Sequence, residues 1–317
     1  MKLIVPDYYT KFVCIADKCR HNCCIGWEID IDSDTYEYYK TMGGYMGEKL
    51  KKNISRKDTP HFILDKNERC PFLNKNNLCE IILNLGEEKL CDICSDHPRF
   101  RNFFENRTEM GLGLCCEEAA RLIVTNTEKV LLINMEKCED ISENPEETYF
   151  FGLRKKVFNI VQDRTICFNK RRANLISELN IFVPDILSEK VKEKYYRLER
   201  LDAEWDKELE NLGKINNIDN DLFLSEEFEI AFEQLLFYFI YRHMADGIYD
   251  ERIRERIAFS ILSTDMIKAL CAVKNKTMGE TKIDDLIDYS RRYSAEIEYS
   301  SENIDTMLDF LEKNGGL

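Results

Sequence analysis

Cysteine side chains are concentrated near the start of the chain. Ten of its thirteen cysteines lie within residues 14–116, and the other three are Cys138, Cys167 and Cys271. Thiolate sulfur is a soft, charged donor that binds zinc ions and iron–sulfur clusters. A disulfide framework is not expected, because the number of cysteines is odd and the N-terminus has no signal-peptide run of apolar residues. The N-terminal third is therefore predicted to bind metal through thiolates.

The spacing of these cysteines bears on which metal they bind. Structural zinc is usually held by two C-x2-C pairs, and here only Cys91 and Cys94 have that spacing. The first group reads C-x4-C-x3-C-C, and its adjacent Cys23 and Cys24 are poorly placed to bind one tetrahedral ion together. This irregular pattern favours a four-iron, four-sulfur cluster. Zinc stays the alternative, and a second metal site stays open.

Three of the four histidines lie among the cysteines. His21 lies between Cys19 and Cys23, from where it could donate a hydrogen bond to the sulfurs of a cluster. His97 closely follows Cys94, and we expect it to lie beside the metal ligands rather than to be one of them.

The composition of the 317-residue chain is that of a globular protein, with 44% hydrophobic and 33% charged residues. The net charge of −14 argues against nucleic-acid binding, which needs a cationic face. No apolar stretch approaches the roughly 20 residues that span a bilayer. Without an export signal, we expect the protein in the reducing cytoplasm, where thiols stay free or bind metal.

The elements expected around the cysteines are short. Residues 27–32 alternate apolar and acidic side chains, which indicates an extended piece, and a helix capped by Ser33 or Asp34 should follow. Residues 74–77 are predicted to form the turn of a hairpin that carries Cys70 and Cys79 on its arms.

Glycines suggest no nucleotide-binding loop. The cluster Gly43, Gly44 and Gly47 has no apolar strand before it, so it is interpreted as a helix stop. Gly111 and Gly113 form an isolated G-x-G, a pattern too common to indicate a cofactor site by itself.

The acidic residues 138–149 are predicted to separate two domains, a cysteine-rich domain over residues 1–137 and a helical domain over residues 138–317. The expected fold is mainly α, with a metal-stapled N-terminal domain of short strands or a hairpin packed on the helical domain. Helices are expected over residues 117–132, 153–161, 173–179, 185–212, 227–249, 253–273 and 283–311.

Two parts of the helical domain carry polar side chains of possible function. Arg242 ends an aromatic helix face that is interpreted as core, with the alternative that it lines a pocket. Tyr293, Glu296, Glu298 and Tyr299 are interpreted as a solvated helix face, with the alternative that they accept a proton from a substrate lysine.

The cysteine motifs resemble those of the flagellin lysine-N-methylase family, which is similar to a broader class of zinc- or iron-chelating cysteine-rich domains. The resemblance covers about residues 5–125 and is weaker through residues 238–250 and 293–303. It is carried by five motifs: Cys14 followed by Cys19-x3-Cys23-Cys24-x-Gly26-Trp27, Cys70-Pro-Phe-Leu, Leu78-Cys79-x-Ile81, Cys91-x2-Cys94-x3-Pro98-Arg99, and Cys115-x-Glu117-x-Ala119-x-Arg121.

The resemblance implies a cytoplasmic enzyme that methylates lysine side chains of flagellin, with S-adenosylmethionine as donor and a four-iron, four-sulfur cluster as cofactor. Two positions depart from the family pattern: Cys116 replaces a proline, so it is not expected to be a ligand, and Tyr299 replaces a histidine. The implied metal ligands are Cys14, Cys19, Cys23, Cys24, Cys70, Cys79, Cys91, Cys94 and Cys115.

Other functions remain open at this stage. A zinc-stapled binding protein without catalytic activity, or an iron–sulfur redox protein, would use the same cysteines. The sequence assigns no catalytic residue, no donor pocket and no oligomeric state.

Overall fold

A computed structural model describes residues 2–56, 59–136 and 144–315 of the chain. The chain forms two compact units, Val13–Arg99 and a second unit that joins Met1–Phe12 to Phe100–Leu317. The expected boundary between residues 137 and 138 lies outside the described residues. The observed division differs from that expectation, because the strands between residues 100 and 136 pair with the N-terminal strand and belong to the helical unit.

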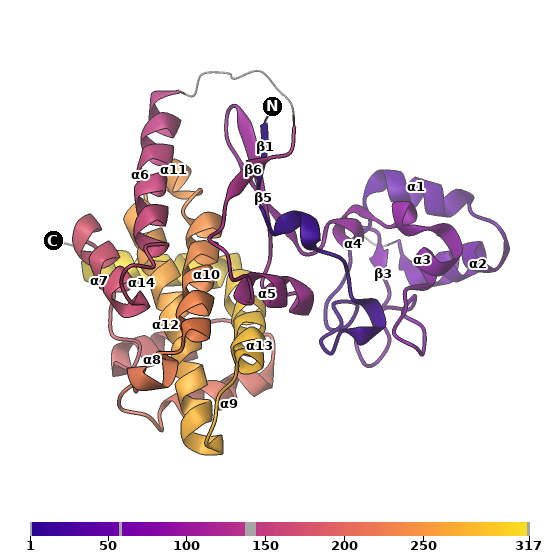
Figure 1. Ribbon diagram of the computed structural model, residues 1–317. Coiled ribbons are helices and arrows are strands. Elements are labelled where there is room, and N and C mark those ends of the chain that lie inside the picture. The colour runs from indigo at the N-terminus through magenta and orange to yellow at the C-terminus, as the bar shows by residue number, and fades with distance from the viewer. Residues whose placement is uncertain (1, 57–58, 137–143, 316–317) are drawn as a thin grey trace. The chain divides into compact units, whose positions relative to one another are not determined.

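The Val13–Arg99 unit is built from short elements on a small core (Figure 1). Ile29, Tyr39, Leu50, Phe62 and Phe72 are among the apolar side chains that fill this core. Its elements are η2 (Ala16–Lys18), α1 (Ser33–Thr41), α2 (Gly44–Asn53), β2 (Ile54–Ser55), β3 (His61–Phe62), α3 (Glu80–Leu85), η3 (Glu87–Lys89) and α4 (Asp92–Asp96).

The structure bears on three local predictions for this unit. The helix after the extended piece is α1, but Asp32 caps it by accepting a hydrogen bond from the Thr35 N–H at 2.8 Å. The hairpin is confirmed by a bridge between Leu73 and Cys79. The glycine cluster ends α1 as expected, yet Gly44 also starts α2.

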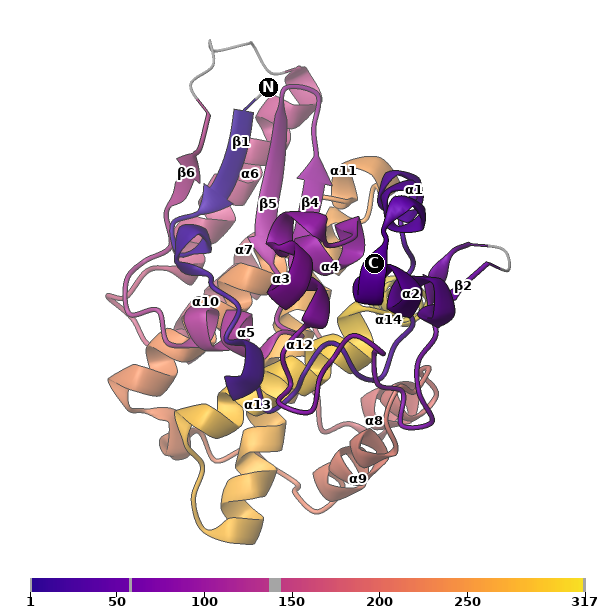
Figure 2. The same ribbon diagram turned by 90° about the vertical axis from the view of Figure 1, so that its right-hand side faces the viewer.

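A four-stranded sheet opens the second unit, and the sequence patterns did not predict it (Figure 2). Its order is β4-β5-β1-β6, with β1 parallel to β5 and antiparallel to β6. Parallel strands need no adjacent hairpin partner, so no local signal marks β1. The strands are β1 (Lys2–Pro6), β4 (Arg99–Phe103), β5 (Arg107–Leu112) and β6 (Leu132–Asn134).

Helices make up most of the second unit, as predicted for a mainly α protein. The segment expected as one helix over residues 185–212 is two helices. The helices are α5 (Glu117–Val124), α6 (Pro145–Val161), α7 (Phe168–Leu179), α8 (Glu189–Tyr196), α9 (Ala203–Leu212), α10 (Glu226–His243), α11 (Gly247–Asp250), α12 (Ile253–Met278), α13 (Ile283–Tyr293) and α14 (Ser301–Gly315). Short helical turns are η1 (Tyr9–Lys11), η4 (Asn220–Phe223) and the π-helical turn η5 (Ser294–Glu298).

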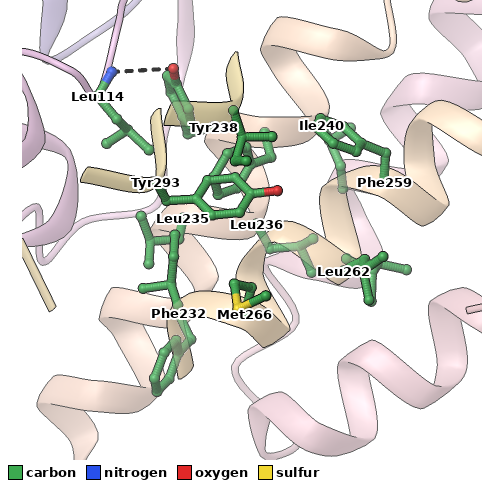
Figure 3. Close-up of a cluster of buried hydrophobic side chains, with 14 of the residues drawn as sticks. Leu114, Phe232, Leu235, Leu236, Tyr238, Ile240, Phe259, Leu262, Met266 and Tyr293 are labelled. Carbon is green, nitrogen blue, oxygen red and sulfur yellow. Dashed lines mark hydrogen bonds between the residues drawn. The ribbon is translucent and has the colours of Figure 1, made fainter. Parts of the chain in front are cut away.

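The core of this unit lies around α10 and α12, which pack side by side in Figure 1. Apolar side chains of both helices interdigitate around Tyr293 (Figure 3). The Tyr293 hydroxyl is held there by hydrogen bonds with Ser263 at 2.8 Å and Tyr195 at 3.2 Å. This packed core fixes the positions of α10 and α13, and with them the polar side chains that the two helices carry inside the unit. In the described part of the chain, no helix combines the length and apolar character needed to cross a bilayer.

Candidate metal centre and candidate active site

Six thiols of the Val13–Arg99 unit come together from three stretches of chain. The electrostatic neighbours of Cys24 include Cys70 and Cys79, and those of Cys94 include Cys24 and Cys70. The hairpin and the starts of α3 and α4 bring these residues to one place. The six are Cys23, Cys24, Cys70, Cys79, Cys91 and Cys94.

Backbone N–H groups point at three of these sulfurs. Cys70 accepts from Phe72 and Leu73, and Cys79 accepts from Ile81 and Ile82. Cys91 accepts from the N–H of Cys94 in the same way. Hydrogen bonds of this kind stabilise the negative charge of thiolates that bind a metal.

Within two pairs, one thiol is acidified at the expense of its neighbour. The hydrogen bond from Cys24, aided by His97 against the effect of burial, lowers the pKa of Cys23 to about 4. The same bond and burial raise the pKa of Cys24. Cys91 and Cys94 form the second pair: their mutual hydrogen bond lowers the pKa of Cys91 and raises that of Cys94. In each pair the thiolate form of one cysteine is thus favoured over that of its neighbour.

Side chains that the cysteine pattern did not point to surround the thiols. The phenol of Tyr39 lies near Cys91 and Cys94, and it donates to the Lys89 carbonyl at 2.6 Å. Asp32 caps α1 and also accepts from the Asp92 N–H at 2.9 Å. The helical spacing of Asp32 and Tyr39 was visible in the sequence, but only the fold shows which face meets the sulfurs.

His97 lies beside the thiols, as predicted. Its ring forms a hydrogen bond with the side chain of Cys23. The centroid of this ring lies 6.1 Å from that of the Trp27 ring. The Trp27 indole N–H in turn donates to the Cys23 carbonyl. These contacts fix the backbone that carries Cys23 and Cys24.

Three further cysteines were also predicted to be ligands. Cys14 is exposed, with the Ala16 N–H 3.4 Å from its sulfur, and Cys19 is partly buried just after η2. Cys115 belongs to the helical unit. The assignment of these three as ligands stays a prediction.

Donor spacing distinguishes a cluster from a single ion. Thiolates around one tetrahedral zinc lie about 3.8 Å apart, given Zn–S bonds of about 2.3 Å. Among the described residues, the group of three donors that all lie within 4.8 Å of one another is Glu28, Asp30 and His61, and no set of three thiols meets that limit. The six thiols therefore have the donor chemistry of a metal centre, and no three of them are gathered as closely as the ligands of one zinc ion.

A second group of polar residues is buried in the helical unit around the carboxylate of Glu298. This side chain is completely inaccessible to solvent and lies at the end of the π-helical turn η5. Tyr238, Arg242 and His243 reach it from the last turns of α10. A π-helical turn is an irregularity often found at functional sites, and here it directs Glu298 inward.

The Glu298 carboxylate has three partners on α10. His243 Nε2 lies 2.6 Å from Oε1, the Tyr238 hydroxyl donates at 3.1 and 3.2 Å, and Arg242 Nε lies 3.4 Å from Oε1. Burial opposes the charged form, but Arg242 and His243 outweigh it and hold the pKa of Glu298 below its usual range. Burial lowers the pKa of His243, against the attraction of Glu298.

Tyr238 links this cluster to the sheet. Its hydroxyl accepts from the Leu114 N–H at 3.2 Å, drawn as the dashed line in Figure 3, and from Arg242 Nη1 at 2.8 Å. Because the same oxygen donates to Glu298, its hydrogen-bonding capacity is filled. Burial raises the pKa of Tyr238 well above its ordinary value, so the phenol stays protonated.

Gly111 has a packing role that the G-x-G pattern did not reveal. A Cβ at this position would lie 2.3 Å from the ring of Phe100. That ring packs edge-on against Tyr238 and lies 5.0 Å from the guanidinium carbon of Arg242. Because Gly111 has no side chain, the Phe100 ring can pack close to this strand and lie beside the Arg242 guanidinium.

The cluster extends from the core to the surface through Arg242. Its guanidinium carbon lies 5.1 Å from the ring of Tyr299, which is 50% exposed. Tyr299 forms a hydrogen bond with Cys115. The guanidinium of Arg242, the phenol of Tyr299 and the thiol of Cys115 thus meet at the edge of the buried Glu298 cluster.

The interpretation of residues 293–299 as a solvated face is wrong for most of these positions. Tyr293 and Glu298 are fully buried, and Glu296 accepts the backbone N–H groups of Leu201 and Asp202 at 2.9 and 2.8 Å. Only Tyr299 is exposed. The aromatic face of α10 is core, as predicted, but Arg242 at its end is mostly buried, since 13% of its side chain is accessible.

Together these features define a helical protein with a thiol-rich unit and a buried charged cluster. Residues 214–316 match the family described as the FliB lysine N-methylase C-terminal domain. The match includes Tyr238, Arg242, His243, Glu298 and Tyr299. It thus covers the segments where the resemblance was expected to be weaker.

Similar proteins come from Salmonella. A lysine-N-methylase of Salmonella typhimurium is 28% identical over 148 residues, which cover 40% of this chain and 33% of that protein. One from Salmonella choleraesuis has the same identity and coverage. The flagellar biosynthetic protein FliU of Salmonella muenchen is 25% identical over 134 residues, or 40% of this chain and 79% of that protein. No solved structure matches the chain.

Residues 214–316 are thus similar to the C-terminal domain of the FliB lysine N-methylases, the family that the cysteine motifs also resemble. The match spans about a third of the length of the two lysine-N-methylases.

Proposed function

We propose that this protein is a cytoplasmic lysine N-methyltransferase that acts on flagellin and uses S-adenosylmethionine. The observation that carries the proposal is the match of residues 214–316 to the FliB lysine N-methylase C-terminal domain. The cluster around Glu298 lies inside the matched residues. The names of the Salmonella relatives support a lysine acceptor and a flagellar substrate.

Methyl transfer sets clear requirements for the acceptor. The donor supplies an electrophilic methyl group on a sulfonium sulfur. The lysine nitrogen forms the new C–N bond with its lone pair, and the electrons of the broken C–S bond stay on sulfur. Because the pKa of free lysine is about 10.4, the ammonium proton must first be lost to a base or to water. A desolvated site favours this loss.

The Glu298 cluster is suited to position groups rather than to react itself. Glu298 and His243 are buried and bonded to each other, so they do not meet a protein substrate. They hold Tyr238 and Arg242 in place, and Arg242 in turn lies beside the exposed Tyr299. We assign Tyr299 as the group that meets the substrate amine, and Glu298 as a positioning residue.

The thiol-rich unit fits the four-iron, four-sulfur cluster that the family resemblance implies. All six convergent donors are thiols, backbone N–H groups point at three of them, and no three of the six all lie within 4.8 Å of one another. Four of Cys23, Cys24, Cys70, Cys79, Cys91 and Cys94 would hold the cluster. When bound, it supplies iron that can bind the amino and carboxylate groups of the methyl donor.

The first test is metal analysis combined with methyl transfer. Anaerobically purified protein should contain about four irons and four acid-labile sulfides per chain, and should transfer labelled methyl groups from S-adenosylmethionine to purified flagellin. No incorporation with an intact cluster would contradict the proposal. A colourless protein with one or two zinc ions and no transfer would instead support a zinc-stapled binding protein.

A pair of isosteric variants tests the role of the Glu298 cluster. Glu298→Gln should lower kcat by at least about tenfold, which corresponds to about 1.4 kcal/mol of barrier, and should leave the iron content unchanged. Glu296→Gln is the control, because it alters a buried carboxylate that bonds only to the chain of the α8–α9 connection. Equal losses in the two variants would show that Glu298 has only a structural role.

A further inference from the structure

A hollow of about 430 Å³ lies in the helical unit. The residues that line it are different from those of the Glu298 cluster. Its walls come from the turn between β4 and β5, from the start of α6 and from α11. Figure 1 shows α6 and α11 side by side. Its lining residues include Phe103, Glu105, Asn144, Glu146, Glu147 and Tyr249.

The lining is acidic. Glu105, Glu146 and Glu147 contribute three carboxylates, and the described residues that line the hollow include no lysine or arginine. Glu146 and Glu147 belong to the first turn of α6, where the helix dipole favours negative charge. Helix-dipole stabilisation explains why carboxylates are tolerated here, but it does not explain why they border an open volume.

Glu147 has an unfilled hydrogen-bonding position. Its side chain is 96% buried, and Oε1 accepts the Glu105 N–H at 2.6 Å. Oε2 is buried and has no hydrogen-bond partner. Arg107 acts on Glu147 electrostatically, but it makes no hydrogen bond to Oε2 and its guanidinium stacks on the Phe151 ring at 3.7 Å. A buried carboxylate oxygen without a donor is costly unless a ligand supplies one.

The neighbouring groups fix the position of this carboxylate. Asn144 caps α6 by accepting the Glu147 N–H at 2.8 Å, and its amide donates to Glu105 at 2.8 Å. Glu105 and Glu147 are thereby tied together across two elements. The buried Glu147 carboxylate is therefore preorganised, and the exposed Glu105 is held beside it.

Aromatic rings border the carboxylates. Phe103 is 63% exposed and Tyr249 is 67% exposed, and the Tyr249 hydroxyl donates to the Phe103 carbonyl. The faces of such rings attract ammonium groups and pack against the methylene chain that carries them. Carboxylates below and aromatic rings beside them form a site for a long aliphatic amine.

We propose that this hollow binds a lysine side chain of the protein substrate, with the ammonium group near Glu147 and the methylene chain against Phe103 and Tyr249. The identity of the ligand as a substrate lysine rests on the proposed function. The preference for an alkylammonium group rests on the hollow itself. The site is a docking position for a substrate segment and requires no methyl transfer.

Binding is measured by isothermal titration calorimetry with the full chain and no methyl donor. The probes are a capped peptide with one central lysine and the same peptide with acetyl-lysine, which removes the charge but keeps the length. The acetyl-lysine peptide should bind at least tenfold more weakly. Equal binding of the two peptides would overturn the proposal.

Variants locate the binding site. Glu147→Gln keeps an acceptor for the Glu105 N–H but removes the charge, and it should weaken lysine-peptide binding about tenfold. Glu178→Gln is the matched control, because that exposed carboxylate on α7 is remote from the hollow and pairs with Lys156; it should leave binding unchanged. Unchanged binding in Glu147→Gln would reject the site.

If Glu147→Gln does not fold, the exposed variants Glu146→Gln and Tyr249→Leu take its place, and each should weaken binding at least threefold. Binding without methyl transfer would reject the proposed function but keep this site. Methyl transfer together with peptide binding that none of the three variants weakens would reject this site but keep the proposed function.

Discussion

His243 Nε2 lies 2.6 Å from Oε1 of Glu298, and both side chains are almost completely buried. The hydrogen bond between a buried carboxylate and a neutral imidazole depends on the proton that the imidazole nitrogen carries. Because Arg242 and Tyr238 bond to the same carboxylate, a change in this pair is transmitted to the groups at the surface.

Acidification should destabilise the protein through His243. Burial lowers its pKa in the folded state from the ordinary 6.5, so the unfolded chain binds this proton more readily. The stabilising effect is fully present above pH 6.5 and is lost as the pH falls below it, by at most about 1.4 kcal/mol per pH unit. The measurement is the free energy of unfolding of the natural chain between pH 7.5 and pH 5.5.

His243→Gln keeps a donor for Glu298 but cannot titrate, so its stability should fall less over the same range. Because the two proteins differ only at residue 243, the contributions of all other residues cancel in the comparison. Parallel pH profiles for the two proteins would contradict the assignment. The lowered pKa of Glu298 adds a second loss only as the pH falls below its ordinary value of 4.5.

Gly111→Ala should destabilise the helical unit. The new methyl group would lie 2.3 Å from the Phe100 ring, and overpacking of this kind costs about 1–3 kcal/mol. The matched control is Gly152→Ala on α6, where a Cβ meets nothing within 4 Å. That substitution should stabilise the protein by roughly 0.5–1 kcal/mol, because alanine is the better helix former. Thermal unfolding of both variants checks the opposite signs.

The sequence predicted the thiol centre better than the charged cluster. The spacing of Cys91 and Cys94, and the hairpin that carries Cys70 and Cys79, are local features, and local chemistry determines them. Glu298 was assigned to solvent because the residues around it are polar. Its burial depends on the π-helical turn and on the last turns of α10, which lie more than fifty residues earlier.

The sheet was missed for a related reason. Lys2 pairs with Arg107 in the parallel β1–β5 ladder, so the partners are separated by about a hundred residues. Neither strand shows a strict alternation, since β5 is buried at both Gly111 and Leu112. Only the packing of α6 and α10 on the sheet explains why a charged residue, Glu109, is buried in it.

Breaking the ion pair between Glu109 and Arg154 should be strongly destabilising. Arg154 donates to both carboxylate oxygens of Glu109 at 2.7 and 2.6 Å, and each side chain is at most 3% exposed. Arg154→Met would leave a buried charge whose other cation is Arg107, 3.9 Å away, and should cost about 3–5 kcal/mol. Lys156→Met, on the same helix but in an exposed pair, should cost about 0–1 kcal/mol.

A double variant separates charge from packing at this position. Glu109→Leu with Arg154→Met removes both charges and should recover most of the loss, as measured by urea unfolding. A double variant as unstable as Arg154→Met alone would show that the lost packing of Arg154 against Phe150 and Phe151 dominates.

Removal of metal should destabilise the Val13–Arg99 unit and leave the helical unit folded. The apolar core of the smaller unit is thin and includes Cys70 and Cys91 themselves, and metal binding to such a unit contributes directly to its folding free energy. Amide hydrogen exchange of the metal-free chain should therefore rise in α1 and α3 and stay slow in α10 and α12.

Cys91→Ser should give the same pattern, because Cys91 is fully buried among the thiols. Cys167→Ser, at an exposed cysteine just before α7, is the control and should keep both metal and protection. Unchanged exchange in α1 and α3 after metal loss would show that the thiols are not what holds this unit together.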